Sequence, residues 1–238
     1  MRKEVVLNTL GLWSGYGGKP VLQGVDMEVR EGEIVAVIGR NGVGKSTLMR
    51  SLIGLLPADR GSVVYKGEAI DSLKAHQRAR LGIGYVPQGR DVFPRMTVLE
   101  NLMVGLSIDG SHTTGDRLDR VFGYFPILAE RRNQRAGTMS GGQQQQLAIG
   151  RVLMGGPSMI LLDEPSEGIQ PNIVQDIARI MVDLNRTTGI TVVFVEQNID
   201  MIRSMAQRCY VMDKGRITTE IEPEILEDRS AVRRFLAV

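Results

Sequence analysis

The sequence predicts an α/β fold in which helices cover both faces of a parallel β-sheet. Short apolar, β-rich runs alternate with amphipathic helical stretches, and the runs lie at residues 34–38, 159–162 and 191–195. This alternation is typical of parallel strands joined by helices. The runs are apolar at almost every position, as expected of strands covered on both faces. They therefore predict the central sheet of the molecule.

Two other regions have different patterns. Residues 5–12, 21–29 and 62–65 are β-rich runs separated by glycines and turn residues, which suits an antiparallel β subdomain near the N-terminus. Between about residues 89 and 138 helical patterns dominate, at 97–106 and 116–125, and Thr97 with Glu100 predicts a capping box. We expect one domain over residues 1–238, with a core at about 1–88 and 156–238 and an inserted helical lobe at about 89–155.

The composition argues against several classes of protein. With 42% hydrophobic and 24% charged residues the chain has the composition of a globular protein, and a net charge of +2 gives no indication of nucleic-acid binding. The single cysteine, Cys209, rules out an intrachain disulfide, and its apolar neighbours predict a buried, unreactive thiol. No run of about 18 apolar residues is present. The N-terminal residues suit a first strand better than a signal peptide.

A phosphate-binding loop follows the run at 34–38. The segment matches G-x-x-x-x-G-K-[ST] at every fixed position, with Gly39, Arg40, Asn41, Gly42, Val43, Gly44, Lys45 and Ser46. Glycines let backbone N–H groups curl around phosphate oxygens, and a helix expected at 45–55 adds the positive end of its dipole. We expect a P-loop NTPase core, in which Lys45 reaches the β and γ phosphates, Ser46 binds Mg²⁺ and Thr47 belongs to the nucleotide site.

Two carboxylates end the run at 159–162. Asp163 and Glu164 come at the carboxyl end of the expected strand, where open α/β sheets bind ligands. Because successive strand residues point to opposite sides, we expect separate roles for the two. Asp163 is predicted to hold Mg²⁺, directly or through water, and Glu164 to polarise an attacking water. The alternative is an ordinary solvated strand end.

A third motif indicates the family. The segment Ser140, Gly141, Gly142 and Gln143 precedes Asp163 and opens a helix expected at 143–154. With the two motifs above, it resembles the ATP-binding subunit of ATP-binding-cassette (ABC) transporters over essentially the whole chain. The family signature is usually Leu-Ser-Gly-Gly-Gln, and Met139 stands here for the leucine. The glutamine run 143–146 is then part of a helix, with a disordered tract as the alternative.

The resemblance implies a substrate, a metal ion and a dimer. Two such subunits sandwich two ATP molecules, with Mg²⁺, head to tail. The segment from Ser140 to Gln143 would therefore face the ATP held by the partner's phosphate loop. Tyr16 matches the aromatic residue that stacks on adenine, and a turn or core tyrosine is the alternative. Gln88 matches the glutamine that touches Mg²⁺ and the attacking water at the hinge to the helical lobe.

Two positions depart from the family pattern. Residues 165–171 occupy the place of the family's D-loop but carry Gly168 and Ile169, with no aspartate at the usual position. Gln197 stands where most members have a histidine, and both histidines of the chain precede residue 140. A glutamine amide donates hydrogen bonds but carries no proton at neutral pH. We therefore assign base catalysis to Glu164 and a positioning and sensing role to Gln197, with a plain strand end as the alternative.

The resemblance is strongest to cassettes of branched-chain amino acid importers. The segments YVPQGRDVFP and VEQN carry it, and GRNGVGK, SGGQQQQLAI and EGIQP resemble the urea and short-amide branch. It implies two transmembrane permease subunits, a second ATPase subunit (a sister cassette or a second copy) and an extracytoplasmic solute-binding protein. The chain would be cytoplasmic and peripheral on the inner face of the cell membrane. A short helical tail at 230–238 would replace the regulatory domain of some sugar importers.

Some alternatives stay open at this stage. A soluble ABC ATPase outside transport, of the cluster-assembly type, also fits the length. Phe93, Pro94 and Met96 follow Gln88 and are expected to contribute to docking a membrane subunit, with a place in the core of the lobe as the alternative. The basic residues Arg131, Arg132 and Arg135 are expected to form a solvated face, with a partner or lipid contact as the alternative.

Overall fold

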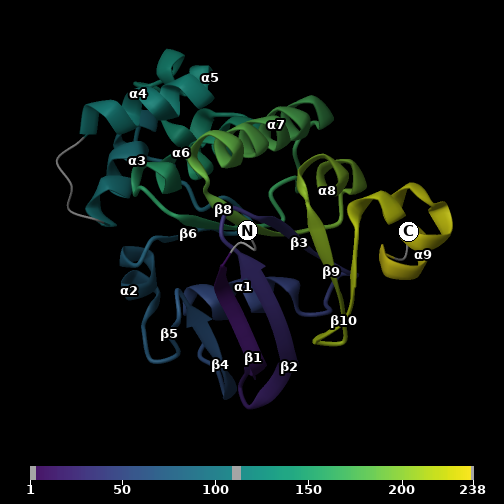
Figure 1. The fold of residues 1–238 in the computed structure, drawn as a ribbon. Coiled ribbons are helices and arrows are strands. Elements are labelled where there is room, and N and C mark those ends of the chain that lie inside the picture. The colour runs from purple at the N-terminus through teal and green to yellow at the C-terminus, as the bar shows by residue number, and fades with distance from the viewer. Residues whose placement is uncertain (1–3, 109–113, 237–238) are drawn as a thin grey trace.

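The computed structural model describes residues 4–108 and 114–236, arranged around two β-sheets (Figure 1). The first sheet is antiparallel, in the order β2-β1-β4-β5. Its strands are β1 (Val5–Tyr16), β2 (Lys19–Arg30), β4 (Arg60–Tyr65) and β5 (Glu68–Ala69). The predicted antiparallel N-terminal subdomain is therefore confirmed.

The second sheet has six strands in the order β10-β9-β3-β8-β7-β6. They are β3 (Ile34–Ile38), β6 (Ile83–Val86), β7 (Met159–Asp163), β8 (Thr191–Glu196), β9 (Arg208–Asp213) and β10 (Arg216–Ile221). All neighbours pair in parallel except β10, which pairs antiparallel with β9. The predicted parallel sheet is therefore confirmed, and it carries one antiparallel edge strand, because the turn at Lys214 and Gly215 folds β10 back as a hairpin.

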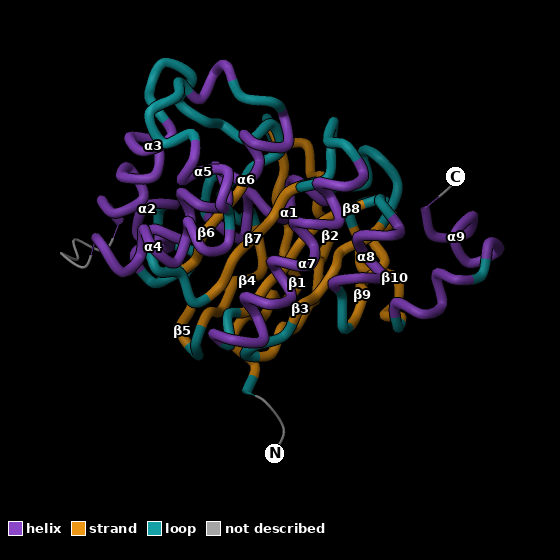
Figure 2. The backbone as a smooth tube through the Cα atoms, turned by 90° about the horizontal axis from the view of Figure 1, so that it is seen from above, coloured by secondary structure: helices purple, strands orange, loops and turns teal. Residues whose placement is uncertain are grey.

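The helices divide into three groups. The first group holds α1 (Lys45–Ile53) and α2 (Ala75–Arg80). The C-terminal group holds α7 (Pro171–Thr188), α8 (Ile199–Met205) and α9 (Arg229–Leu236). The lobe holds α3 (Val98–Gly105), α4 (Thr114–Tyr124), α5 (Pro126–Glu130) and α6 (Gly141–Met154). Short 3₁₀ turns lie at Leu106–Ile108, Ala136–Thr138 and Pro223–Glu227. Seen from above, α9 lies beside β10, and the helices of the lobe lie at the opposite end of the sheet (Figure 2).

The central strands face two separate cores. In β8, Val192 and Phe194 belong to the cluster under the lobe and α7, whereas Val193 and Val195 belong to the cluster around α1. The alternation follows from the two-residue repeat of a strand. Helix α1 lies between the two sheets, and all six residues of β8 are buried. This burial explains the apolar runs in the sequence.

The segment expected to form the lobe is helical. No strand occurs in the described part of residues 89–138. The Thr97 Oγ1 accepts a hydrogen bond from the Glu100 N–H at 3.2 Å, and the Glu100 carboxylate accepts one from the Thr97 N–H at 2.7 Å. This confirms the capping box. Residues 237 and 238 of the expected tail lie outside the described residues, and none of the described helices has the length and apolar character of a membrane span.

Candidate functional site

The predicted phosphate-binding, metal-binding and catalytic residues meet at the carboxyl ends of the parallel strands, whereas Tyr16 ends β1 and residues 140–143 begin α6. The phosphate loop follows β3, Asp163 ends β7, Gln88 lies just past β6 and Gln197 follows β8. Since parallel strands end at one edge of the sheet, residues from four distant segments come together there. The site is therefore a product of the sheet order and not of sequence proximity.

The phosphate loop has a backbone that needs glycine. Gly39, Gly42 and Gly44 have φ values of 153°, 78° and 117°. A Cβ on Gly39 would lie 2.3 Å from the carbonyl oxygen of Met212, so any other residue would displace β9. Gly44 is the N-cap of α1. Because glycine has no side chain to cap the helix, the first N–H groups of α1 are left to a ligand.

The Lys45 ammonium is buried inside this loop. Its Nζ donates to the carbonyl oxygens of Gly39 at 3.0 Å and Arg40 at 3.1 Å, and lies 3.4 Å from Glu164 Oε1. Lys45 is only 4% exposed. The loop therefore surrounds a single positive charge, as expected of a group that meets phosphate.

Ser46 and Asp163 form an oxygen-rich pair. The Ser46 Oγ donates to Asp163 Oδ1 at 2.8 Å, and Tyr85 Oη donates to Asp163 Oδ2 at 3.1 Å. Burial raises the pKa of Asp163, and the hydrogen bonds from Ser46 and Tyr85 oppose that shift. Mg²⁺ in nucleotide sites takes one or two protein oxygens together with phosphate oxygens. The Ser46 hydroxyl and the Asp163 carboxylate fit this pattern, so these two side chains would hold the ion beside a nucleotide.

Glu164 lies at the centre of the site. Its carboxylate accepts hydrogen bonds from Gln88 Nε2 at 3.2 Å and from Gln197 Nε2 at 3.4 Å, in addition to the contact with Lys45. Strand β7 ends at Asp163, and Glu164 has a φ of 48°. The expectation that strand alternation separates the two carboxylates is therefore wrong. A left-handed turn directs Glu164 instead, at a steric cost often found in functional sites.

Glu196 and Glu167, at this edge, were not assigned a role from the sequence. Glu196, 3% exposed, accepts hydrogen bonds from the Ser166 hydroxyl at 2.8 Å and from the backbone N–H groups of Ser166, Gln197 and Asn198. Glu167 accepts from Gln88 at 3.0 Å, and Asn41 accepts from Gln197. The only signal for Glu196 was a carboxylate closing an apolar strand.

A comparison with known families agrees with this geometry. The family model described as "ABC transporter" matches residues 22–167, more than half of the 238 residues. The chain belongs to the ABC transporter family. It is the ATP-binding domain of that family, and its activity is ATP hydrolysis coupled to transport.

Individual relatives and a solved structure agree with this assignment. The chain is 48% identical to the high-affinity branched-chain amino acid transport ATP-binding protein BraG of Pseudomonas aeruginosa, over 85% of this chain and 86% of that protein. It is 35% identical to the lipopolysaccharide export system ATP-binding protein LptB of Escherichia coli, over 97% and 96%. The dimeric, post-hydrolysis structure of the cassette MJ0796 bound to ADP and Pi superposes with a TM-score of 0.82 at 25% identity, over 91% and 98%.

The ABC signature segment begins helix α6. Ser140 is its N-cap, and its Oγ accepts from the Gln143 N–H at 3.4 Å, while Gln143 Oε1 accepts from the Ser140 N–H at 3.1 Å. Gln145 and Gln146 are buried. The glutamine run therefore belongs to a packed helix, and the disordered alternative is wrong. A Cβ on Gly142 would lie 2.8 Å from Ile173 of α7, so this glycine is needed for close packing.

Tyr16 lies at the end of β1 and is 46% exposed. Its Oη accepts from Arg50 Nη1 at 3.3 Å. The alternative of a core tyrosine is therefore wrong, and that of a turn tyrosine stays open, since Tyr16 is the last residue of β1. Arg50, on α1, was not singled out from the sequence, because a basic residue near a helix end is ordinary.

The residues of the lobe that were expected to dock a membrane subunit or to form a basic face are exposed. Phe93 is 44% and Met96 39% exposed, so the alternative of a place in the core of the lobe is wrong for both. Pro94 and the basic residues Arg131, Arg132 and Arg135 are also exposed, as expected of a solvated face. The guanidinium of Arg151 lies 5.1 Å from the centre of the Phe93 ring.

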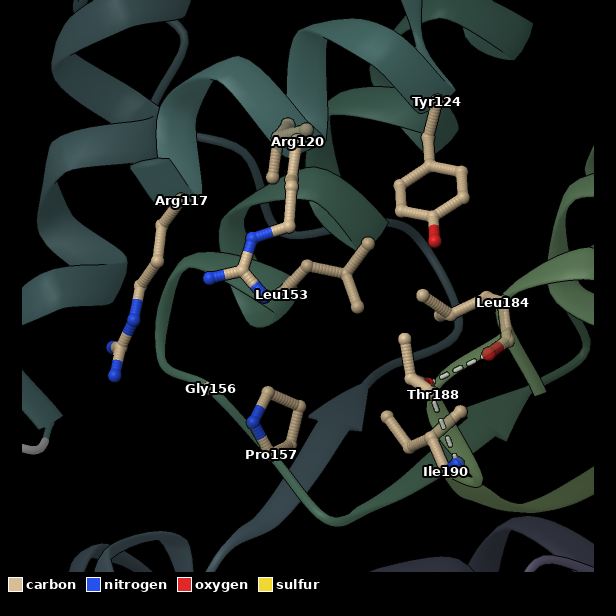
Figure 3. Close-up of a pocket in the computed structure, with 10 residues that line it drawn as sticks. Arg117, Arg120, Tyr124, Leu153, Gly156, Pro157, Leu184, Thr188 and Ile190 are labelled. Carbon is tan, nitrogen blue, oxygen red and sulfur yellow. Dashed lines mark hydrogen bonds between the residues drawn. The ribbon is translucent and has the colours of Figure 1, made fainter. Parts of the chain in front are cut away.

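A half-open pocket lies apart from the site. A cavity of about 260 Å³ is lined by Arg117, Arg120 and Tyr124 from α4 and by Leu184 and Thr188 from α7 (Figure 3). Pro157 and Ile190 place it near the amino ends of β7 and β8, at the sheet edge opposite to the phosphate loop. None of the predicted site residues lines it.

Proposed function

We propose that the chain is the ATP-hydrolysing subunit of an import system for a small polar solute, either a branched-chain amino acid or urea and short amides. The observation that carries the catalytic part is the position of Glu164, which contacts Lys45, Gln88 and Gln197 at once. A carboxylate placed this way reaches the region where the γ-phosphate of a nucleotide on the loop would lie. The 48% identity to BraG supports import over other uses.

The residues divide the chemistry among themselves. The backbone N–H groups of the phosphate loop, with Arg40, Asn41 and Val43 between its glycines, bind the phosphate oxygens, and Tyr16 stacks on the base. Lys45 exchanges its carbonyl and Glu164 partners for β and γ oxygens. When bound, Mg²⁺ neutralises phosphate charge. Ser46 and Asp163 would hold it, with Gln88 nearby, and Thr47 would support the loop.

Glu164 and Gln197 act on the water and the γ-phosphate. Glu164 takes the proton of the attacking water. Gln197 cannot do so, because a glutamine amide has no group that titrates near neutral pH. Gln197 donates hydrogen bonds that orient the carboxylate and the phosphate. Gln88 joins this cluster to the lobe, so loss of the γ-phosphate changes the contacts at the hinge. The lobe, residues 89–155, is the part that moves relative to the core at 1–88 and 156–238.

The partners follow from the exposed elements. The N-terminus of α6, with Ser140, Gly141, Gly142 and Gln143, faces the nucleotide of a second ATPase subunit, either a sister cassette or a second copy. Two transmembrane permease subunits provide the pore, and Phe93, Pro94 and Met96 contribute to the surface that they contact. An extracytoplasmic solute-binding protein delivers the solute. The chain then works at the inner face of the cell membrane.

One observation favours a second transport direction. LptB, an export protein by name, is 35% identical over 97% of this chain. A soluble cassette of the cluster-assembly type is the alternative outside transport. The chain should be expressed with the products of its neighbouring genes and membranes isolated, followed by ATP-dependent uptake of labelled leucine and labelled urea into vesicles.

The outcomes of this experiment separate the alternatives. Co-purification with membrane subunits and uptake of one solute support the proposal, and a Glu164→Gln complex provides the inactive control. ATP hydrolysis without any membrane partner would favour the soluble cassette. A membrane complex that takes up neither solute would favour export.

A further inference from the structure

Arg90 holds the loop that replaces the family's D-loop. It lies two residues past Gln88, and its Nη2 donates to the backbone carbonyl of Glu167 at 2.8 Å. The same nitrogen lies 3.4 Å from the carbonyl oxygen of Gly168. A guanidinium is a planar group with five N–H donors, so it can hold two consecutive carbonyls in a way that an ammonium cannot.

The same guanidinium lies against the start of the signature helix. A Cβ placed on Gly141 would be 3.0 Å from Arg90 Nη1 and 3.2 Å from Cζ. A Cβ on Gly168, whose φ is 63°, would be 3.4 Å from Nη2. The plane of Arg90 therefore fills the space between Gly141 and Gly168. The missing Cβ of Gly141 lets the helix approach the side chain, whereas the positive φ of Gly168 is what favours glycine in the loop.

The backbone of Arg90 is also held by a residue further along the signature helix. Arg151, on the same helix α6, donates from Nη2 to the Arg90 carbonyl at 3.5 Å and stacks over Phe93. Gln88 in turn contacts the Glu167 carboxylate at 3.0 Å. The segment from Gln88 to Phe93 thus contacts the signature helix at Gly141 and at Arg151. It contacts residue 167 through the side chains of both Gln88 and Arg90.

This arrangement violates two local preferences. Gly89, Arg90 and Asp91 are consecutive residues with φ values of 88°, 73° and 46°, and the left-handed region disfavours side chains such as arginine. A cation beside Gly141 also opposes the dipole of α6. Among the described residues, no carboxylate forms a salt bridge with Arg90. Conflicts of this kind that survive in a fold mark positions kept for function.

We propose that Arg90 is a positioning residue that joins the signature helix to residues 167 and 168, so that the two elements facing the partner subunit move together. The proposal rests on the proposed ATPase function and deepens it. A movement of Gln88, beside the γ-phosphate site, is then transmitted through Gly89 and Arg90 to the signature helix and to residues 167 and 168. Gly168, the departure from the family pattern, provides one of the two carbonyls that Arg90 contacts.

The test compares Arg90→Lys and Arg90→Gln in the assembled transporter. Lysine keeps the charge but loses the planar fork, and glutamine loses the charge. We expect both variants to lower kcat for ATP about 2- to 30-fold, the range of a weakened coupling. ATP binding to the separate chain should stay within about twofold, because Arg90 contacts Gly141 and residues 167 and 168 and none of the residues predicted to bind ATP on the same chain. Arg132→Lys, on the exposed face of the same lobe, is the control.

Each outcome has a definite meaning. An unchanged kcat in both variants overturns the proposal. Normal turnover in Arg90→Lys with a loss in Arg90→Gln shows that charge matters and the fork does not, which also overturns it. Weaker ATP binding in both places Arg90 in the nucleotide site instead. An inactive parent complex would contradict the proposed function itself, and circular dichroism with a thermal melt shows whether either variant has failed to fold.

Discussion

The side-chain amide of Gln197 donates a hydrogen bond to the Glu164 carboxylate at 3.4 Å and a second one to Asn41. One amide therefore links the proposed base to the phosphate loop. Its own backbone N–H is held by Glu196 at 2.9 Å, so the position of Gln197 is set from the end of β8. This arrangement gives an amide, instead of a titrating ring, the task of orienting the carboxylate.

Replacing Gln197 with alanine removes both donors. We expect kcat for ATP hydrolysis to fall about 10- to 100-fold, since a hydrogen bond to a charged group contributes about 1.5–3 kcal/mol. The KM for ATP should change little if the bonds matter most in the transition state. Steady-state hydrolysis and transport should be measured side by side. Wild-type rates in both assays would show that Gln197 is an ordinary strand end.

Replacing Glu164 with glutamine removes the proposed base while keeping a similar shape. Turnover should fall by about 10²–10⁴, the usual size of a lost general base. ATP should still bind, and the dimer should accumulate in its nucleotide-bound form, which size-exclusion chromatography with ATP can detect. Glu68→Gln, on the exposed strand β5, is the matched control. Hydrolysis at the parent rate would remove Glu164 from the catalytic role.

A charge at Phe93 should uncouple the ATPase from its membrane partner. The ring is 44% exposed, so Phe93→Asp should fold without a buried charge. We expect ATP binding to stay intact and transport to fall at least about tenfold, because an exposed apolar patch marks a contact surface. Leu10→Asp, with 54% exposure on β1, serves as the control. Full transport by Phe93→Asp would exclude this residue from the docking surface.

The Glu33–Arg208 pair should make stability depend on pH. Burial raises the pKa of Glu33, but the hydrogen bonds from Arg208 and Arg30 outweigh it, so the pKa lies below the usual 4.5. The carboxylate therefore stabilises the fold fully above its unfolded pKa and loses this contribution as the pH falls through its folded pKa.

The corresponding variant is Glu33→Gln. It should lower the free energy of unfolding by about 3 kcal/mol at pH 7, because it leaves the buried guanidinium with only the more exposed Glu220 carboxylate as its charge partner. The difference from wild type should shrink below pH 4.5. Urea unfolding at pH 7 and near pH 3 measures it, with Glu31→Gln, an exposed neighbour, as the control. A difference that is the same at both pH values would contradict the sign.

Much of the fold was predictable because burial leaves a periodic trace. Strand β3 has the predicted bounds, Ile34–Ile38, and β8 extends one residue further than its apolar run, to Glu196. Strand β6 escaped prediction because Gly84 interrupts its four residues. The antiparallel pairing of β10 depends on a turn at Lys214 and Gly215, and two exposed threonines in β10 give no apolar signal.

The site was predictable where chemistry dictates residue type, and less so where geometry does. The phosphate loop and Asp163 are recognisable because glycines and a carboxylate are needed at fixed spacings. The left-handed backbone of Glu164 and the hydrogen bonds of Glu196 depend on how β7 and β8 end beside each other. The 2.8 Å hydrogen bond from the Ser166 hydroxyl to the Glu196 carboxylate joins two residues that no local sequence pattern relates.

The single thiol of the chain, Cys209, offers a practical advantage. It is fully buried in β9, and burial, with Glu222 and Glu224 nearby, raises its pKa to about 12. A maleimide reagent at neutral pH would find no reactive thiolate on the folded chain. Each cysteine introduced at an exposed position would then be the one site of labelling. Spectroscopic probes could follow the opening and closing of the cassette pair without first removing the native residue.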